Sequence, residues 1–277
     1  MLAAAALMTL AVVGLVRPAG GEEASTRHRA LVDAAAYPWS AVGRVNVAVS
    51  RRGHCTGALI GERLVVTAAH CLYFRANERW VAPEYVHFLA GYQRGEMVAH
   101  AKAARYVVAP GFDGARWSDP SNLPHDWALI VLERPIGRET GYLGWREIPK
   151  TAEGQALMDA NRFALTGYPR DRQHALSIDP DCRFESFLSV GASAPPLLAH
   201  SCAIIFGDSG APLILRGQAG PQVVALNSAA DVSLSDGRRI NSAVPLATFA
   251  QEIRALLVET EGEAAGAGAR SGAPPSR

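Results

Sequence analysis

Net charge is almost absent from this sequence. Its 277 residues include 27 Lys or Arg and 26 Asp or Glu, which leaves a formal charge of +1 at pH 7. A protein that binds nucleic acid through its charge needs clustered basic residues, and so does one that binds an anionic membrane surface. The basic pairs Arg51-Arg52 and Arg238-Arg239 are isolated, so we expect no nucleic-acid partner.

Long apolar runs are scarce as well, and the one candidate for an export signal is at the N-terminus. Residues 1–16 contain no charged side chain, and the small residues of 17–21 suit a cleavage site. No Lys or Arg precedes the apolar run, which departs from the usual signal peptide. We expect 1–21 to be a cleaved signal peptide, with a retained anchor or a buried helix as alternatives. This predicts a secreted or periplasmic protein that meets a membrane only if the segment is retained.

Cysteine is limited to four residues, which permit three pairings. A pairing between sequence neighbours closes two short loops, each contributing on the order of 3 kcal/mol in the chain-entropy model. Disulfides also indicate an oxidising compartment, in agreement with an export signal. The alternative, a zinc site from the pairs His54-Cys55 and His70-Cys71, does not follow a usual zinc-finger spacing. The pairing between neighbours joins Cys55 to Cys71 and Cys182 to Cys202.

The most informative stretch that is present is Gly207-Asp208-Ser209-Gly210. A serine flanked closely by glycines can be a nucleophile on a tight turn that a substrate carbonyl can approach. Alone it is weak evidence, because the same residues also form ordinary turns between strands. Two upstream segments strengthen it: a histidine in Thr67-Ala68-Ala69-His70-Cys71 and an aspartate in Asp126-Trp127-Ala128-Leu129-Ile130.

The order His70, Asp126, Ser209 in these three contexts resembles the chymotrypsin/trypsin family of serine peptidases. The resemblance covers about residues 29–258. In its short loops and few disulfides the chain is similar to the bacterial branch of the family. It implies an all-β fold of two antiparallel six-stranded Greek-key β-barrels followed by a C-terminal α-helix. It also implies a secreted serine endopeptidase whose site lies in the cleft between the barrels.

The resemblance implies a role for each residue of the motif. Ser209 is the nucleophile, His70 is its base and then the acid for the leaving amine, and Asp126 orients His70. Backbone N–H groups of Gly207 and Ser209 form the oxyanion hole, and neither a metal nor an organic cofactor is needed. Asp113 and Asp119 compete with Asp126, but only Asp126 is followed at once by an apolar strand that would hold a carboxylate buried.

Substrate specificity is less well indicated. Trypsin-like members carry an acidic residue where this chain has Ala203, so we do not expect cleavage after Lys or Arg. An inward Arg238 or Arg239 would favour an acidic substrate residue, and a small apolar preference is equally open. We expect a monomer that acts on a protein or peptide substrate and has a protein inhibitor as a further partner. By alignment, the substrate-binding walls contain Ala203 and Phe206 on one side and Ser228 and Ala230 on the other.

Short β-prone runs separated by turn residues fill most of the chain. We expect a peptidase domain over 37–260, with barrels at about 37–136 and 150–246 and a helix at the end. Residues 22–36 would be a lead-in or propeptide, and the composition of 261–277 predicts a disordered tail. In the family, cleavage frees an amino terminus that pairs with the residue equivalent to Asp208. The usual Ile-Val-Gly-Gly is missing here, and Arg29-Ala30-Leu31-Val32 is the nearest substitute.

Two other classes of protein stay open. A non-catalytic binding protein could use the same scaffold, although Gly207 and the three motif residues are all present. A periplasmic protease-chaperone would carry an appended peptide-binding domain and usually no disulfides, which the short C-terminal segment and four cysteines disfavour.

Overall fold

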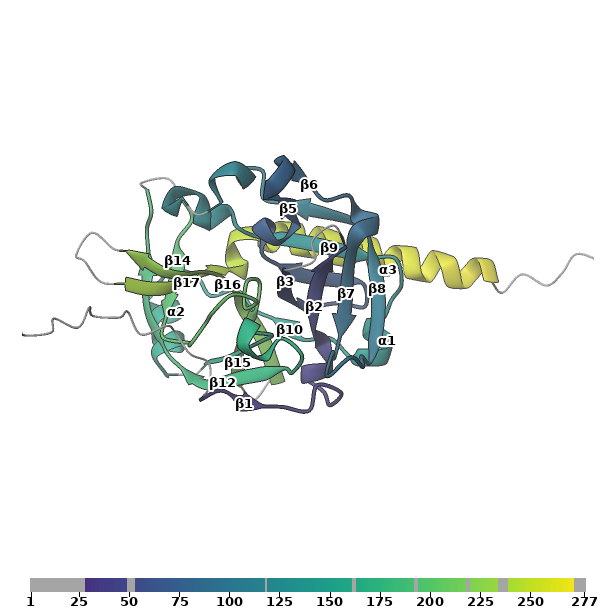
Figure 1. Ribbon diagram of the computed structural model, residues 1–277, viewed down its shortest axis with the longest axis horizontal. Coiled ribbons are helices and arrows are strands. Elements are labelled where there is room, and N and C mark those ends of the chain that lie inside the picture. The colour runs from purple at the N-terminus through teal and green to yellow at the C-terminus, as the bar shows by residue number, and fades with distance from the viewer. Residues whose placement is uncertain are drawn as a thin grey trace, which may run out of the picture.

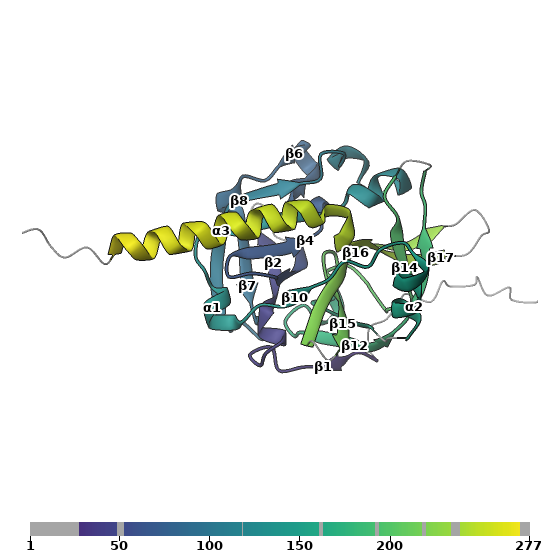
Figure 2. The ribbon, with the colours of Figure 1, turned by 180° about the vertical axis from the view of Figure 1, so that it is seen from behind.

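Two β-structures lie side by side, and the C-terminal helix α3 (Ala250–Ser271) runs along the first of them (Figures 1 and 2). The computed structural model describes residues 28–48, 53–117, 119–160, 163–191, 194–217, 220–233 and 239–271. The expected signal peptide or anchor, residues 1–21, lies outside these ranges. No helix within them is long and apolar enough to span a bilayer.

The first β-structure is a closed barrel of six antiparallel strands, in the order β2-β3-β4-β9-β8-β7. Every residue of β4 and β9 is buried, because these strands face the barrel interior on one side and contact α3 on the other. Their unbroken apolar sequences follow from burial on both faces. The strands are β2 (Val42–Val47), β3 (His54–Leu59), β4 (Leu64–Thr67), β7 (Val86–Ala90), β8 (Ala99–Val108) and β9 (Ala128–Leu132).

The second β-structure follows the order β1-β12-β11-β15-β16-β17-β14-β13, and β10 adds to β16 in parallel. Apart from the added β1 and β10, the sheet runs from β12 to β13, and only Arg183 separates these two in the chain. One continuous length of chain therefore contributes to both edges, and the sheet forms the second six-stranded barrel. Its strands are β11 (Phe163–Gly167), β12 (Ser177–Cys182), β13 (Phe184–Leu188), β14 (Leu197–His200), β15 (Pro212–Gly217), β16 (Gly220–Ser233) and β17 (Arg239–Pro245), with β1 (Ala30–Leu31) and β10 (Gly144–Trp145) added.

Short elements fill the connections. A small two-stranded sheet, β5 (Tyr73–Phe74) and β6 (Arg79–Trp80), follows Leu72, and α1 (Gly137–Thr140) and α2 (Ala152–Ala160) lie between the barrels in sequence. The 3-10 helices are η1 (Trp39–Ala41), η2 (Ala69–Leu72), η3 (Arg75–Asn77), η4 (Pro83–Tyr85), η5 (Gly114–Arg116), η6 (Pro120–His125), η7 (Arg170–Arg172) and η8 (Leu246–Phe249).

Both disulfides join sequence neighbours, as the pairing argument predicts. Cys55 bonds Cys71 with Cα atoms 6.1 Å apart, and Cys182 bonds Cys202 with Cα atoms 4.6 Å apart. The first ties η2, which carries His70, to strand β3. The second joins the end of β12 to the segment that leads to Ser209.

Two expected boundaries differ from the structure. The lead-in is not wholly outside the fold, because Ala30 and Leu31 form β1 and pair with Ile178 and Ser177 of β12. Helix α3 continues to Ser271, into the segment for which composition predicts a disordered tail. Ala and Glu are frequent at the start of that segment and have high helix propensity, which outweighs its glycines.

Candidate active site

His70 and Asp126 are held together at the end of the first barrel. His70 lies in η2, just after β4, and Asp126 is the C-cap residue of η6, two residues before β9 begins. Because β4 and β9 are paired neighbours in the barrel, the two segments emerge side by side. The Nδ1 of His70 is 2.8 Å from Oδ2 of Asp126, and the backbone N–H of His70 donates to Oδ1 at 2.9 Å.

Asp126 is 1% exposed and its carboxylate accepts three hydrogen bonds. The third comes from the hydroxyl of Ser228, 2.6 Å from Oδ2. Burial alone raises the pKa of Asp126, but the charge and hydrogen bonds of His70, with the Ser228 hydroxyl, lower it below the usual range. Asp126 therefore remains ionised and fixes Nδ1 of His70 as the protonated nitrogen.

Asp113 and Asp119, the competing aspartates, have other partners. Asp113 caps η5 and pairs with Arg116, and Asp119 caps η6 through the N–H and hydroxyl of Ser121. These contacts hold the loop that precedes Asp126. Of the three aspartates, Asp126 is the one beside His70.

Ser209 is brought to the same region by backbone contacts between the barrels. The Thr56 N–H donates to the Ser209 carbonyl at 2.9 Å, and a Cβ on Gly210 would lie 2.7 Å from the Ala68 nitrogen. Gly210 therefore fits directly against the segment that leads to His70. The Ser209 hydroxyl makes no hydrogen bond to His70 within the described part of the chain.

The turn before Ser209 requires glycine. Gly207 has φ +101°, and a Cβ there would lie 2.2 Å from the Tyr168 carbonyl oxygen. The Thr56 hydroxyl holds the Gly207 carbonyl at 2.9 Å. The N–H groups of Gly207 and Ser209 have no acceptor among the residues that the structure describes, so both can bind an incoming oxygen.

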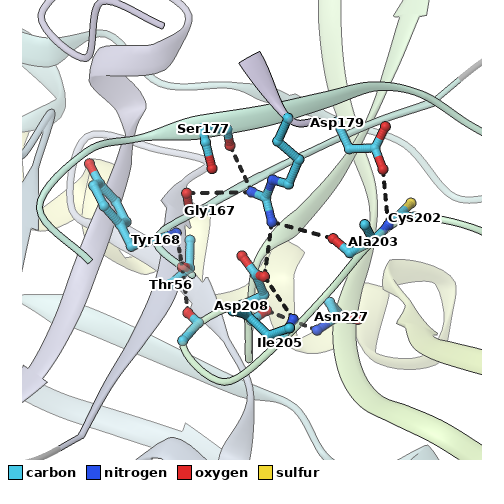
Figure 3. Close-up of polar contacts among 12 residues, drawn as sticks. Thr56, Gly167, Tyr168, Ser177, Asp179, Cys202, Ala203, Ile205, Asp208 and Asn227 are labelled. Atoms are coloured by element: carbon cyan, nitrogen blue, oxygen red, sulfur yellow. Dashed lines mark hydrogen bonds and ion pairs between the residues drawn. The ribbon is translucent and has the colours of Figure 1, made fainter. Parts of the chain in front are cut away.

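Asp208, between these two N–H groups, is fully buried and pairs with Arg29. Dashed lines in Figure 3 mark this ion pair at the labelled Asp208 carboxylate. Nη1 of Arg29 is 2.9 Å from Oδ2 of Asp208, and both side chains are 0% exposed. Sequence reasoning singled out the segment at Arg29 as a substitute amino terminus, but it did not predict that the side chain provides the cation.

Aromatic and basic side chains lie near the site, and of these sequence reasoning named Phe206 but missed Trp117, Arg75 and Arg170. The Trp117 ring lies 5.7 Å from the His70 ring, and the Arg75 guanidinium lies 4.4 Å from the Trp117 ring centre. Phe206, directly before Gly207, is 67% exposed, with the Arg170 guanidinium 5.4 Å from its ring centre.

The expected specificity residues occupy different environments. Ala203 is half-buried and donates its N–H to Asp179 at 2.9 Å, while Ala230 is exposed. The Ser228 side chain faces Asp126 and so does not line a pocket wall. Arg239 is exposed at the start of β17, and Arg238 lies outside the described residues.

The cysteines near His70 do not form the alternative zinc site. Cys55, His70 and Cys71 have ligand atoms within 4.8 Å of one another. However, the two sulfurs are bonded to each other, and zinc binds the free thiolate. His54 instead donates from Nε2 to the Tyr168 carbonyl at 2.6 Å, beside Gly207.

Comparison with known proteins agrees with this geometry. The sequence model of the Trypsin family matches residues 33–181, more than half of the chain. The chain belongs to the trypsin family of serine peptidases. The matched residues include His70 and Asp126, and Ser209 lies beyond them.

Relatives of this trypsin-family chain include a glutamyl endopeptidase of Bacillus licheniformis, 27% identical over 140 residues. That alignment covers 50% of this chain and 38% of the relative, so the chain spans well under half of the relative's length. A solved Glu endopeptidase has a TM-score of 0.62 at 19% identity, covering 83% of this chain and 96% of the other. A thermostable serine protease AL20 from an extremophilic microorganism has a TM-score of 0.56 at 17% identity, covering 77% and 94%. These two structures show the fold alone.

Proposed function

We propose that the protein is a secreted serine endopeptidase that hydrolyses peptide bonds through an acyl-enzyme, with His70, Asp126 and Ser209 as its triad. The observation that carries this proposal is the buried Asp126 carboxylate, which accepts Nδ1–H of His70 at 2.8 Å. This contact leaves Nε2 of His70 as the basic nitrogen. Asp126 also stabilises the imidazolium that forms when Nε2 takes a proton.

The chemistry then follows in two halves. The Ser209 oxygen attacks the substrate carbonyl carbon while its proton moves to Nε2 of His70. The carbonyl oxygen becomes an oxyanion that accepts hydrogen bonds from the N–H groups of Gly207 and Ser209. His70 protonates the departing amine, which leaves the acyl group on Ser209. Water, deprotonated by His70, attacks this ester and regenerates the hydroxyl.

The Ser209–His70 contact is expected to form on binding of substrate. Catalytic hydrogen bonds are often long or poorly aligned before substrate binds, and they tighten in the complex. The backbone contacts of Ser209 to Thr56 and of Gly210 to the His70 segment already place the turn.

We propose a protein or peptide substrate without a basic residue before the cleaved bond. Neither Ala203 nor Phe206 offers a negative charge to a Lys or Arg side chain. The Bacillus licheniformis relative is a glutamyl endopeptidase, which makes an acidic residue a candidate, with small apolar residues as the alternative. A peptide library with one varied position decides between them.

Labelling with a fluorophosphonate probe tests the nucleophile. We expect the exported wild-type protein to react and Ser209→Ala not to react, because only an activated serine is phosphonylated. Ser201→Ala is the matched control, since Ser201 is exposed on the same segment and accepts a hydrogen bond from the Arg183 N–H. Equal labelling of wild type and Ser209→Ala would contradict the assignment.

A second candidate is a non-catalytic binding protein on this scaffold. The specific observation in its favour is that the Ser209 hydroxyl and His70 are not hydrogen-bonded. It predicts that folded, disulfide-bonded wild type neither reacts with the probe nor cleaves any library peptide, yet retains peptides at equilibrium. Cleavage that is lost in Ser209→Ala would exclude it.

A further inference from the structure

A guanidinium is completely enclosed beneath the turn that carries Ser209. Four oxygens accept hydrogen bonds from Arg29, and the shortest contacts are 2.7 Å to the Ser177 carbonyl and 2.9 Å to Asp208. The Ala203 and Gly167 carbonyls lie at 3.4 and 3.5 Å. These acceptors surround the guanidinium with partial and full negative charge, which a buried cation requires.

The backbone around Arg29 is held from both sides. Strand β1 follows it directly and pairs with β12 through Ala30 and Leu31. The guanidinium of Arg172 donates to the Arg29 carbonyl at 2.5 Å. Both of these contacts come from segments that follow Arg29 in the chain, β12 and η7.

Asp208 of the Arg29–Asp208 ion pair lies within the turn 207–209, which carries the two N–H groups of the oxyanion hole. The Asp208 Oδ2 that meets Arg29 also accepts the Ile205 N–H at 3.1 Å, which ties the carboxylate to the start of the turn (Figure 3). The other oxygen, Oδ1, fits against Gly167, where a Cβ would lie only 2.5 Å from it. Because Asp208 lies between Gly207 and Ser209, fixing its side chain fixes both N–H groups of the hole.

We propose that Arg29 is the built-in counter-ion of Asp208 and positions the oxyanion hole, so that the site needs no free α-ammonium group produced by cleavage. The inference rests on the proposed peptidase function and deepens it. Arg29 is a positioning residue, since it acts through Asp208 and the turn. Cleavage just after Arg29 would lower activity, because it would detach the cation from Asp208. This is the opposite of zymogen activation, in which cleavage raises activity. Leu31, 54% exposed, lies close to that position.

The first experiment changes the amino terminus. Chains that begin at Glu22 and at His28 are compared, each with its α-amino group free and acetylated. We expect the same kcat for all four, because the cation at Asp208 is a side chain. Activity that appears only after trimming, or only with a free amino group, would overturn the proposal.

The second experiment removes the cation. We expect Arg29→Ala to lower kcat by about 10²–10³-fold, the loss typical of one oxyanion donor, with a smaller change in KM. Arg29→Lys keeps the charge but cannot reach all four acceptors, so its kcat should lie in between. Arg138→Ala, in an exposed ion pair with Glu62, is the matched control and should match wild type.

Rescue separates positioning from a merely structural role. Guanidinium chloride, at concentrations well below those that unfold the protein, should restore part of the kcat of Arg29→Ala by filling the vacated site. Circular dichroism and the melting temperature report the folded fraction. If Arg29→Ala does not fold, the graded kcat of Arg29→Lys tests the same point. A wild-type kcat in folded Arg29→Ala or Arg29→Lys would overturn the inference.

The proposed function and this inference fail differently. If wild type neither reacts with the fluorophosphonate nor cleaves peptides in any of the four amino-terminal forms, the peptidase function is wrong, and the inference fails with it. If wild type is active and loss of Arg29 leaves kcat unchanged, only the inference about Arg29 is wrong.

Discussion

The Asp126 carboxylate is buried and held by three hydrogen bonds. Its Oδ2 accepts from Nδ1 of His70 at 2.8 Å and from Ser228 at 2.6 Å, while Oδ1 accepts the His70 N–H. A buried carboxylate with these donors has one stable position. The imidazole it holds is therefore restricted to one orientation and one tautomer.

At Gly207 a single added methyl group should disable the site. Gly207→Ala places Cβ 2.2 Å from the Tyr168 carbonyl oxygen, at a residue whose φ is +101°. The turn must therefore move, and the residue 207 N–H no longer points at the oxyanion. We expect kcat to fall by roughly 10²-fold or more, as when one oxyanion donor is lost. Steady-state kinetics on a cleaved peptide measure this.

Gly217→Ala is the matched control for that substitution. Gly217 ends β15, and a Cβ there meets nothing within 4 Å. Its kcat should equal that of wild type. Equal losses in the two variants would mean that the Gly207 effect is a general fault in folding.

Strand β14 carries a titratable group into the second barrel. His200 is 2% exposed, and burial lowers its pKa to about 4. Burial has the same effect on His54 of β3, whose pKa is also about 4. The pKa of Asp208 shifts in the opposite direction, because burial raises it to about 6 although the charge of Arg29 lowers it.

These shifts predict a loss of stability in acid. Below pH 6.5 the unfolded chain protonates both histidines, whereas the folded chain does so only near pH 4, so the free energy of unfolding falls between these values. Asp208 takes up a proton in the folded state below about pH 6, which stabilises the folded chain in acid. This one group offsets only part of the loss from the two histidines. Urea unfolding at pH 7 and pH 4 measures the difference.

His200→Gln isolates the contribution of one strand. The pH 7 to pH 4 difference should shrink by about 3 kcal/mol, because 1.36 kcal/mol corresponds to each unit of pKa shift. The comparison uses the difference between pH values, so a constant cost of the substitution cancels. An unchanged difference would exclude His200 as a source of acid sensitivity.

On the scale of the whole molecule, the C-terminal segment ties the second barrel to the first. The Phe249 ring of η8 stacks on Trp127 at 4.6 Å with 9° between the planes, and Trp127 is the residue after Asp126. Leu257 of α3 packs against Gly61. The chain that leaves the second barrel thus supports the segment that carries a residue of the site.

Phe249→Ala should therefore affect both stability and activity. Phe249 is fully buried, and removing such a ring costs about 3–5 kcal/mol of unfolding free energy. Activity should fall as well, because Trp127 loses the ring that holds it. Val258→Ala on α3, where Val258 is 72% exposed, should stay within about 0.5 kcal/mol of wild type. Chemical denaturation and kcat measured on the same samples test the pair.

Local patterns in the sequence predicted much of this protein. Alternating strands and turns indicated the barrels, short cysteine separations indicated both disulfides, and the contexts of His70 and Asp126 indicated that the two would meet. Such signals are reliable because strand period, turn chemistry and loop closure act over a few residues. Composition alone does not set the end of α3, which continues to Ser271, because helix propensity competes there with glycine content.

Only the tertiary structure decided which distant side chains meet. Ser228 reaches Asp126 across 102 positions, and Arg29 reaches Asp208 across 179. No local period encodes such contacts, because they depend on the register of the strands and the packing of the two barrels. Burial then makes the partner obligatory, since an enclosed carboxylate needs a donor or a cation. The sequence alone determined the reactive residue types, and packing determined what holds them in place.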